Sequence, residues 1–212
     1  MNPNKKKAYE NAANTIIKNL AKRQIEGYYC DSKEDALKKA LELMPEGSSI
    51  GWGGSMTISE IGLMDAIKSG SYDIIDREAA TTDEERKAVY ARMVNADYFL
   101  MSTNAITMDG ELVNIDARGN RVSFLIFGPS NVLVIAGMNK VVSDVEAGYK
   151  RVKDIATPPN TVRLNRQTPC ATTGRCGDCY SPDCICNSTV ITRRSGTPNR
   201  LKVILVGEEL GY

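Results

Sequence analysis

A glycine-rich turn between an apolar strand pattern and a helical pattern constrains the fold of this chain more than any other feature. It lies within Ile50–Gly62, and Gly51, Gly53 and Gly54 let its backbone bend sharply because glycine has no Cβ. The missing side chain also lets a ligand approach the backbone closely. Two interpretations are open: a turn that only packs a strand against a helix, and a turn that binds a ligand. We favour the second.

The residues after the glycines predict the start of a helix. Thr57 and Glu60 have the spacing of a capping box, which places the helix start at Thr57. A helix N-terminus presents free N–H donors and a partial positive charge, and both suit an anion. Glu60 is either the reciprocal half of this cap or a carboxylate that faces a ligand. We expect an anion to bind at Gly53, Gly54, Ser55 and Thr57.

The turn lacks the signatures of two common nucleotide sites. A Gly-x-Gly-x-x-Gly dinucleotide motif that begins at Gly51 needs glycine at position 56, where the chain has Met56. The Gly-Lys-Ser/Thr sequence of a P-loop is absent. The sequence therefore carries no nicotinamide or ATP signature, and the predicted ligand is a small anionic metabolite.

The composition is typical of one globular α/β domain over residues 1–212, with 42% hydrophobic and 25% charged residues. A net charge of +1 gives no indication of nucleic-acid binding. No apolar run reaches a membrane-spanning length, and Met1–Lys7 lacks the apolar core of a signal peptide, so we expect a cytoplasmic protein without a membrane contact. The chain contains no histidine, which excludes Ser/His and Cys/His catalytic pairs.

Helices and strands alternate over the first half of the chain, which predicts a mostly parallel sheet built from βα units, with helices on both faces. Helices are expected over Lys5–Arg23, over Ser32–Met44, from Thr57 and from Thr81. Strands are expected at Gly27–Cys30, Ser48–Ile50, Tyr72–Ile75 and Asp97–Ser102.

The alternation of strands and helices stops after Thr103. There Asp109-Gly110 lies between two apolar segments and predicts a β-hairpin. Gly119-Asn120 is expected to turn into a further apolar strand segment. The last predicted helix ends at a pair of prolines, and a cysteine-rich segment follows at about 160–195. The expected elements are strands at Val122–Phe127, Val132–Ala136, Ser188–Thr192 and Leu201–Val206, and a helix at Val141–Ile155 closed by Pro158-Pro159.

Polar residues interrupt the apolar runs at predicted strand ends and turns. Ligands of open α/β sheets bind at the carboxyl edge of the strands, where such side chains converge. Asp116 is a candidate acid or base, or a partner that holds Arg121, and Lys140 is a candidate to neutralise an anion. Each residue also has an ordinary explanation as a turn residue, a cap or a surface ion pair. The predicted pocket adds Thr103, Asn104, Asn114, Arg121, Asn139 and Lys140 to the glycine-rich turn, with Asp116, Glu60 and Lys140 as catalytic candidates.

Five of the six cysteines lie within seventeen residues, which indicates a metal site because cytosolic thiols stay reduced. Four thiolates hold either Zn²⁺ or an iron–sulfur cluster, and the spacing does not decide between them. A disulfide or unliganded thiols are the other interpretations. Cys184 and Cys186 point in opposite directions in an extended chain, so four ligands are expected from five candidates. These are Cys170, Cys176, Cys179, Cys184 and Cys186.

The chain resembles the lactate-utilisation (LUD) domain family. The motifs that carry the resemblance extend over nearly the whole sequence, and the cysteine-rich tail is similar to that of a subgroup. They are Gly51–Thr57 with Glu60–Gly62, Ser102–Gly110, Asn114–Asp116, Gly119–Arg121 with Gly128-Pro129, Val134–Lys140, and the tail Cys170–Cys179 with Ile185–Asn187.

The resemblance implies a fold similar to the sugar-isomerase (NagB/RpiA) and CoA-transferase superfamily, in which a glycine-rich loop holds an anionic substrate. It also implies a role linked to lactate-type oxidation. An alternative is a non-catalytic or electron-relay subunit that docks onto an iron–sulfur oxidoreductase. Another is an isomerase- or transferase-type enzyme that acts alone. The family supplies no established catalytic residue, and assembly into a homo-oligomer is compatible with the sequence.

Overall fold

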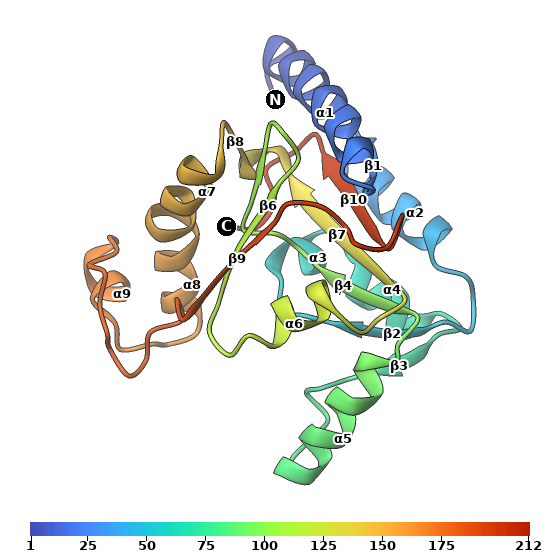
Figure 1. Ribbon diagram of the computed structural model, residues 1–212, viewed down its shortest axis with the longest axis vertical. Coiled ribbons are helices and arrows are strands. Elements are labelled where there is room, and N and C mark those ends of the chain that lie inside the picture. The colour runs from blue at the N-terminus through green and yellow to red at the C-terminus, as the bar shows by residue number, and fades with distance from the viewer.

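The computed structural model describes residues 1–212 and is built on a six-stranded parallel sheet with the order β1-β10-β7-β4-β2-β3 (Figure 1). The mostly parallel sheet expected from the alternating pattern is confirmed. Strand β10 comes last in the chain but lies between β1 and β7. The strands are β1 (Glu26–Cys30), β2 (Ser49–Trp52), β3 (Asp73–Ile75), β4 (Tyr98–Met101), β7 (Asn131–Gly137) and β10 (Leu201–Val206).

Alternate residues of these strands enter two hydrophobic cores, one on each face of the sheet, as the period of two in a strand requires. In β4, Phe99 and Met101 belong to one core, whereas Tyr98 and Leu100 belong to the other. The first core contains side chains from α1 (Pro3–Lys22), α5 (Asp83–Val94) and α6 (Asn120–Ile126). The second contains side chains from α2 (Lys33–Leu43), α3 (Met56–Glu60) and α4 (Leu63–Ser69). The expectation of helices on both faces is confirmed.

A second sheet of four strands has the order β8-β5-β6-β9. The predicted hairpin at Asp109-Gly110 joins its antiparallel strands β5 (Ala105–Thr107) and β6 (Leu112–Asp116). Strand β9 (Ser188–Thr192) pairs with β6, and β8 (Val141–Val142) pairs with β5. The hairpin is thus the centre of a separate sheet that packs against Val152 in a small third core.

The glycine-rich turn leads into a short helix that begins one residue before the predicted start. Ser55, and not Thr57, is the N-cap of α3, and its hydroxyl accepts the Ile58 N–H at 3.3 Å. The capping box of Thr57 with Glu60 was wrong, because the Glu60 carboxylate accepts the N–H of Gly211 at 2.7 Å. The helix expected from Thr57 is divided into α3 and α4 at Gly62, whose φ of 74° suits glycine.

Two further expectations were wrong. The segment predicted as a strand at Val122–Phe127 is helix α6, which buries Val122, Phe124 and Leu125. The helix predicted over Val141–Ile155 begins only at Val145 and does not end at the prolines. It runs through α7 (Val145–Arg151), a π-helical segment η2 (Val152–Ala156) and α8 (Thr157–Arg163). The N–H groups at the first positions of a helix have no acceptor within it, so proline, which lacks an N–H, is tolerated at the start of α8.

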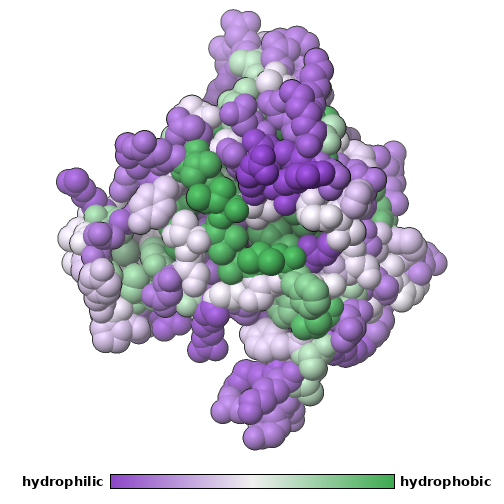
Figure 2. Space-filling view, in the orientation of Figure 1, coloured by the Kyte–Doolittle hydropathy of each residue, from purple (hydrophilic) through white to green (hydrophobic).

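The cysteine-rich segment contains one short helix, α9 (Pro169–Thr173), and lies beside α7 and α8 in Figure 1. Helices α1 and α5 project from opposite ends of the molecule (Figure 1), and hydrophilic residues dominate both projections (Figure 2). A hydrophobic band crosses the middle of the face shown in Figure 2. None of the helices combines the length and the apolar character needed to cross a membrane.

Candidate functional site

A cavity of about 460 Å³ lies where four parallel strands of the central sheet end. Ser55 follows β2, Arg77 follows β3, Ser102 follows β4 and Lys140 follows β7, and all four line the cavity. Because these strands are parallel, their carboxyl ends share one edge of the sheet, which is the usual ligand edge of open α/β folds. We call this cavity the cleft.

Positive charge dominates the cleft. Seven of its lining residues are arginine or lysine, and two are glutamate or aspartate. Such an excess of basic groups in a concave site attracts anions. The basic lining residues are Arg77, Arg86, Arg118, Arg121, Lys140, Arg163 and Arg166, and the acidic ones are Glu78 and Asp116.

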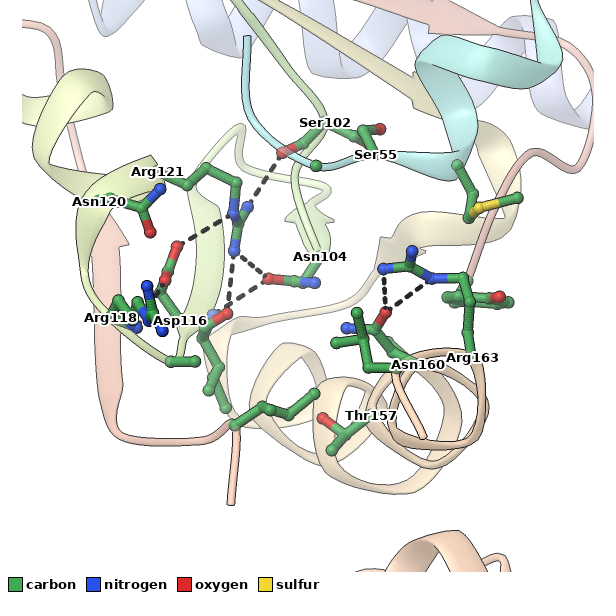
Figure 3. A pocket seen from close by; sticks show the side chains of 18 of the residues that line it. Ser55, Ser102, Asn104, Asp116, Arg118, Asn120, Arg121, Thr157, Asn160 and Arg163 are labelled. Carbon is green, nitrogen blue, oxygen red and sulfur yellow. Dashed lines mark hydrogen bonds and ion pairs between the residues drawn. The ribbon is translucent and has the colours of Figure 1, made fainter. Parts of the chain in front are cut away.

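Arg121 is the centre of a hydrogen-bond network on one wall of the cleft (Figure 3). Its Nε donates to the Asp116 carboxylate at 3.2 Å, and its terminal nitrogens donate to the carbonyl oxygens of Ser102 and Ile115 at 3.1 and 2.9 Å. Asp116 also accepts the N–H groups of Arg118 and Gly119. Burial lowers the pKa of Arg121, and the charge of Asp116 opposes this shift.

Two asparagines complete the network. Arg121 donates to the side-chain oxygen of Asn114 at 2.6 Å and to that of Asn104 at 2.9 Å. All five guanidinium N–H donors therefore have acceptors within the protein. The oxygen of Asn104 also accepts the Ile115 N–H. The amide nitrogen of Asn104 points across the cleft in Figure 3, towards Asn160 and Arg163. We call the wall formed by Asn104, Asn114, Asp116 and Arg121 the locked wall.

Three other arginines border the cleft without a carboxylate partner. The Arg77 side chain makes no hydrogen bond within the protein, and its Nη2 would lie 3.1 Å from a Cβ added at Gly54. Arg163 donates only to the side-chain oxygen of Asn160, at 3.2 and 2.7 Å. Arg118 is exposed and its guanidinium likewise has no ion pair. We call Arg77, Arg118 and Arg163 the open arginines.

Lys140 lies at the base of the cleft and is 4% exposed. Its Nζ donates to the hydroxyl oxygens of Thr57 and Ser102 at 2.9 and 3.0 Å, and it has no ion pair. Burial lowers the pKa of Lys140 to about 7, and the charges of Arg151 and Arg121 act in the same direction. Glu60 acts in the opposite direction.

The π-helical segment η2 and the start of α8 form the far side of the cleft. Val152 and Ala156 of η2 line it together with Thr157 and Asn160 of α8. A π-helix is a rare insertion that often marks a functional site, because it shifts the following side chains around the helix.

Seven of the twelve predicted pocket residues line the cleft, and five do not. Thr57 is buried and bonds to Lys140 and to the Leu210 carbonyl, while Asn139 binds the backbone of Leu210 and Gly211. The cleft is lined by Gly54, Ser55, Thr103, Asn104, Asp116, Arg121 and Lys140, and not by Gly53, Thr57, Glu60, Asn114 or Asn139.

The five clustered cysteines line a second cavity of about 320 Å³, which we call the cysteine cavity. All five are free thiols, and burial raises the pKa of Cys186 to about 11. The Sγ of Cys184 accepts the Cys186 N–H at 3.4 Å, and the Thr157 hydroxyl lies 3.5 Å from the Sγ of Cys186. No group of three or more potential metal ligands converges on one point.

The two cavities share a wall. Ile115, Thr157 and Ile185 line both of them. Thr157 faces the cleft in Figure 3 while its hydroxyl lies near Cys186. The cysteine-rich segment is therefore part of the surroundings of the cleft.

Fold and site together define an α/β protein with a basic ligand cleft at the carboxyl edge of a parallel sheet. The family model of the LUD domain matches residues 13–206. The chain belongs to the LUD domain family, which confirms the resemblance. No curated protein matches the sequence.

One solved structure agrees with this protein at the level of the fold. A DUF162 family protein from Deinococcus radiodurans covers 95% of this chain and 98% of its own length, at a TM-score of 0.51 and 15% identity. Ribose 5 phosphate isomerase A from Neisseria gonorrhoeae covers 53% of this chain and 54% of its own, at a TM-score of 0.35 and 17% identity. The second similarity is too low to establish a shared fold.

Sequence reasoning missed the open arginines as part of the pocket. Arg77 follows β3 by two residues, so the rule that parallel strands end at one edge could have found it. Arg163 comes from α8, beyond the prolines that were expected to end the helix, and the sequence carries no signal for its approach to the cleft.

Proposed function

We propose that this protein binds a small anionic metabolite, a carboxylate or a phosphate ester, in the cleft. The observation that carries this proposal is the set of open arginines, whose charges face a concave cavity without a carboxylate partner. A charge-assisted hydrogen bond from arginine to a carboxylate or phosphate is about twice as strong as a neutral one. Membership of the LUD family supports a link to lactate-type utilisation, and lactate and pyruvate are small carboxylates of this class.

The test removes one open arginine. The protein and its Arg77→Gln variant are titrated with inorganic phosphate, pyruvate and lactate by calorimetry, and thermal unfolding is followed at each concentration. We expect at least one anion to stabilise the wild type, and Arg77→Gln to bind it roughly tenfold more weakly, a change of about 1.4 kcal/mol.

Arg194→Gln is the matched control, because Arg194 is exposed and lies outside the lining of the cleft. This variant removes the same charge and should keep wild-type affinity. An equal loss in both variants would assign the effect to net charge and contradict the site. Absence of binding by every anion tested would contradict the proposed function itself.

We also propose a thiolate metal centre in the cysteine cavity, held by four of Cys170, Cys176, Cys179, Cys184 and Cys186. Five free thiols around one cavity support it, and so do the donors near the sulfurs, since N–H and O–H groups near thiolate sulfurs tune such centres. Zinc and an iron–sulfur cluster both suit this donor set. The thiols do not converge in the described structure, so binding would draw the loop around the cavity inward.

Anaerobic purification with metal analysis and a visible absorption spectrum tests this centre. An iron–sulfur cluster absorbs visible light, whereas a zinc site is colourless. Cys179→Ser should lose the metal, and Cys30→Ser should keep it, because Cys30 lies buried in β1 outside the cavity. Wild-type protein that is metal-free after anaerobic purification would contradict the proposal.

An electron-relay subunit is the second candidate function. The observation that favours it is the exposure of the loop around the cysteine cavity, where Tyr180 is fully accessible to a partner. Electron transfer to an added iron–sulfur oxidoreductase, without turnover by the protein alone, would support the relay. Turnover by the protein alone would instead support an isomerase- or transferase-type enzyme.

A further inference from the structure

Lys140 has a bonding pattern that suits a nucleophilic amine. Its Nζ donates to the Thr57 and Ser102 hydroxyl oxygens. The proton of each hydroxyl is directed to a backbone carbonyl, that of Leu210 for Thr57 and that of Thr103 for Ser102, both at 3.3 Å. The two oxygens therefore act as acceptors towards Lys140.

A neutral amine fits these two acceptors completely. It has two N–H donors, which Thr57 and Ser102 accept, and one lone pair that fills the remaining tetrahedral direction. A lysine that serves only to neutralise an anion is instead an ammonium with three donors, and such a group is usually found with a carboxylate. Lys140 has no carboxylate within ion-pair distance, although it is almost fully buried.

The charged groups around Lys140 come from three packed elements. Arg121 of α6 and Arg151 of α7 disfavour a further positive charge, whereas Glu60 of α3 favours it. Arg151 donates to the carbonyl oxygens of Asn139 and Asn104, so its charge is not neutralised by a carboxylate. Because of burial and these two arginines the pKa of Lys140 is about 7. A neutral amine at that pH is the form in which lysine attacks carbonyl carbon.

We propose that Lys140 forms an imine with an anionic ligand that carries a ketone or aldehyde group, such as a 2-oxo acid or a phosphorylated carbonyl compound. This inference rests on the proposed function, since the open arginines would hold the carboxylate or phosphate of the same ligand. Lys140 and the open arginines line the same cavity, which therefore offers one partner to each end of such a molecule.

The step is balanced without a further reactant. The Nζ lone pair attacks the carbonyl carbon, and the carbonyl oxygen takes up a proton to give a carbinolamine. The carbon–oxygen bond then breaks, the oxygen leaves as water with the protons lost from nitrogen, and a carbon–nitrogen double bond remains. The Thr57 and Ser102 hydroxyls lie next to the nitrogen and are placed to carry protons between nitrogen and oxygen.

Reductive trapping tests the imine. The wild-type protein is incubated separately with pyruvate, glyoxylate, dihydroxyacetone phosphate and glyceraldehyde 3-phosphate, treated with sodium cyanoborohydride, and mapped by peptide mass spectrometry. We expect one equivalent of reduced adduct on Lys140 with at least one of these probes. Lys150, which is exposed, serves as the internal control for unselective labelling.

The amount of adduct on Lys140, measured as a function of pH, is a second test that the wild-type protein alone provides. The adduct on Lys140 should rise through pH about 7, whereas the background on exposed lysines should rise only towards pH ~10. At pH 7 the neutral fraction of Lys140 is roughly a thousandfold larger than that of an ordinary lysine. Lys140→Met removes the amine and should lose the adduct.

The outcomes separate this inference from the proposed function. Binding of the probes by calorimetry, with no adduct on Lys140 at any pH, would overturn the imine and leave the anion site intact. An adduct spread evenly over Lys140 and exposed lysines would overturn it as well. Absence of both binding and adduct with all four probes would remove the imine together with its anion site.

Discussion

The two sides of the cleft use the same side chain in opposite ways. On the locked wall, the Arg121 side chain is 13% exposed, and all of its N–H groups donate to acceptors of the protein itself. On the other sides, Arg77 and Arg163 meet no carboxylate and face the cavity. An arginine in a basic pocket is thus available to a ligand only when some of its donors remain free and no carboxylate neutralises its charge. Arg121 shapes the cleft, and the open arginines are the groups available to an anion.

The largest expected effect comes from removing the guanidinium of the locked wall. Arg121→Met leaves Asp116 and several buried acceptors without their donor, so we expect a loss of about 3–5 kcal/mol in the free energy of unfolding. Arg77→Met, which breaks no hydrogen bond or ion pair, should change the free energy of unfolding by less than about 0.5 kcal/mol. Urea denaturation of both variants measures the two changes in the free energy of unfolding. Equal losses in Arg121→Met and Arg77→Met would contradict the distinction between the locked wall and the open arginines.

Lys140 provides the next test, because it belongs neither to the locked wall nor to the open arginines and its pKa is lowered to about 7. Above pH 7 the folded protein releases the Lys140 proton, whereas the unfolded chain keeps it until pH ~10.4. The unfolded state therefore binds more protons in this window, and stability rises with pH there. Relative to Lys140→Met, the wild type should gain about 3–4 kcal/mol between pH 7 and pH 10.

Urea denaturation of the wild type and of Lys140→Met at several pH values gives this difference, in which the titration of tyrosines and cysteines cancels. Below pH 7 both states of the wild type are protonated, and the difference should become constant. A difference that stays flat from pH 6 to pH 10 would show that Lys140 titrates as an ordinary lysine.

Substitutions at Gly53 and Gly54, which approach Arg121 and Arg77 respectively, should have smaller effects on stability. A Cβ at Gly53 would lie 3.1 and 3.2 Å from the Cγ and Cδ of Arg121, which the locked wall holds in place, so Gly53→Ala should destabilise by about 1–3 kcal/mol. A side chain at Gly54 would meet only the mobile end of Arg77. Gly54→Val should therefore keep most of the stability but abolish the stabilisation of the protein by an anion. Unchanged stabilisation in Gly54→Val would count against the proposed seat of the anion.

Local signals in the sequence predicted much of the fold. Ser32 caps α2 by accepting the Asp35 N–H, as its position before an amphipathic run indicates. Strands β9 and β10 have the predicted bounds. The segment at Val122–Phe127 failed because a short apolar run fits a buried strand and a buried helix equally well. Pro158-Pro159 failed as a stop signal because a preceding π-helical segment carries the helix past them.

The sequence predicted many of the residues of the candidate site, but not which arginines are used within the protein and which remain available to a ligand. The sequence placed Asn104, Asp116 and Arg121 together because they follow neighbouring strands or turns. It could not show that every donor of Arg121 is used within the protein. The five acceptors come from β6 and from the loop between β4 and β5, and they meet Arg121 only in the folded chain. The approach of the open arginines depends on packing between segments far apart in sequence.

The position of β10 has a consequence for how the protein is made. A ribosome synthesises β1 and β7 long before β10, yet β10 separates them in the sheet and pairs with both. Strands β7, β4, β2 and β3 can pair before Leu201–Val206 is synthesised, whereas β1 has no strand partner in the sheet until then. The segment that follows β10 then covers Thr57 and Glu60. The cleft is thus completed only after Leu201–Val206 has been synthesised, and a chain truncated before β10 is expected to expose the unpaired edges of β1 and β7 to chaperones.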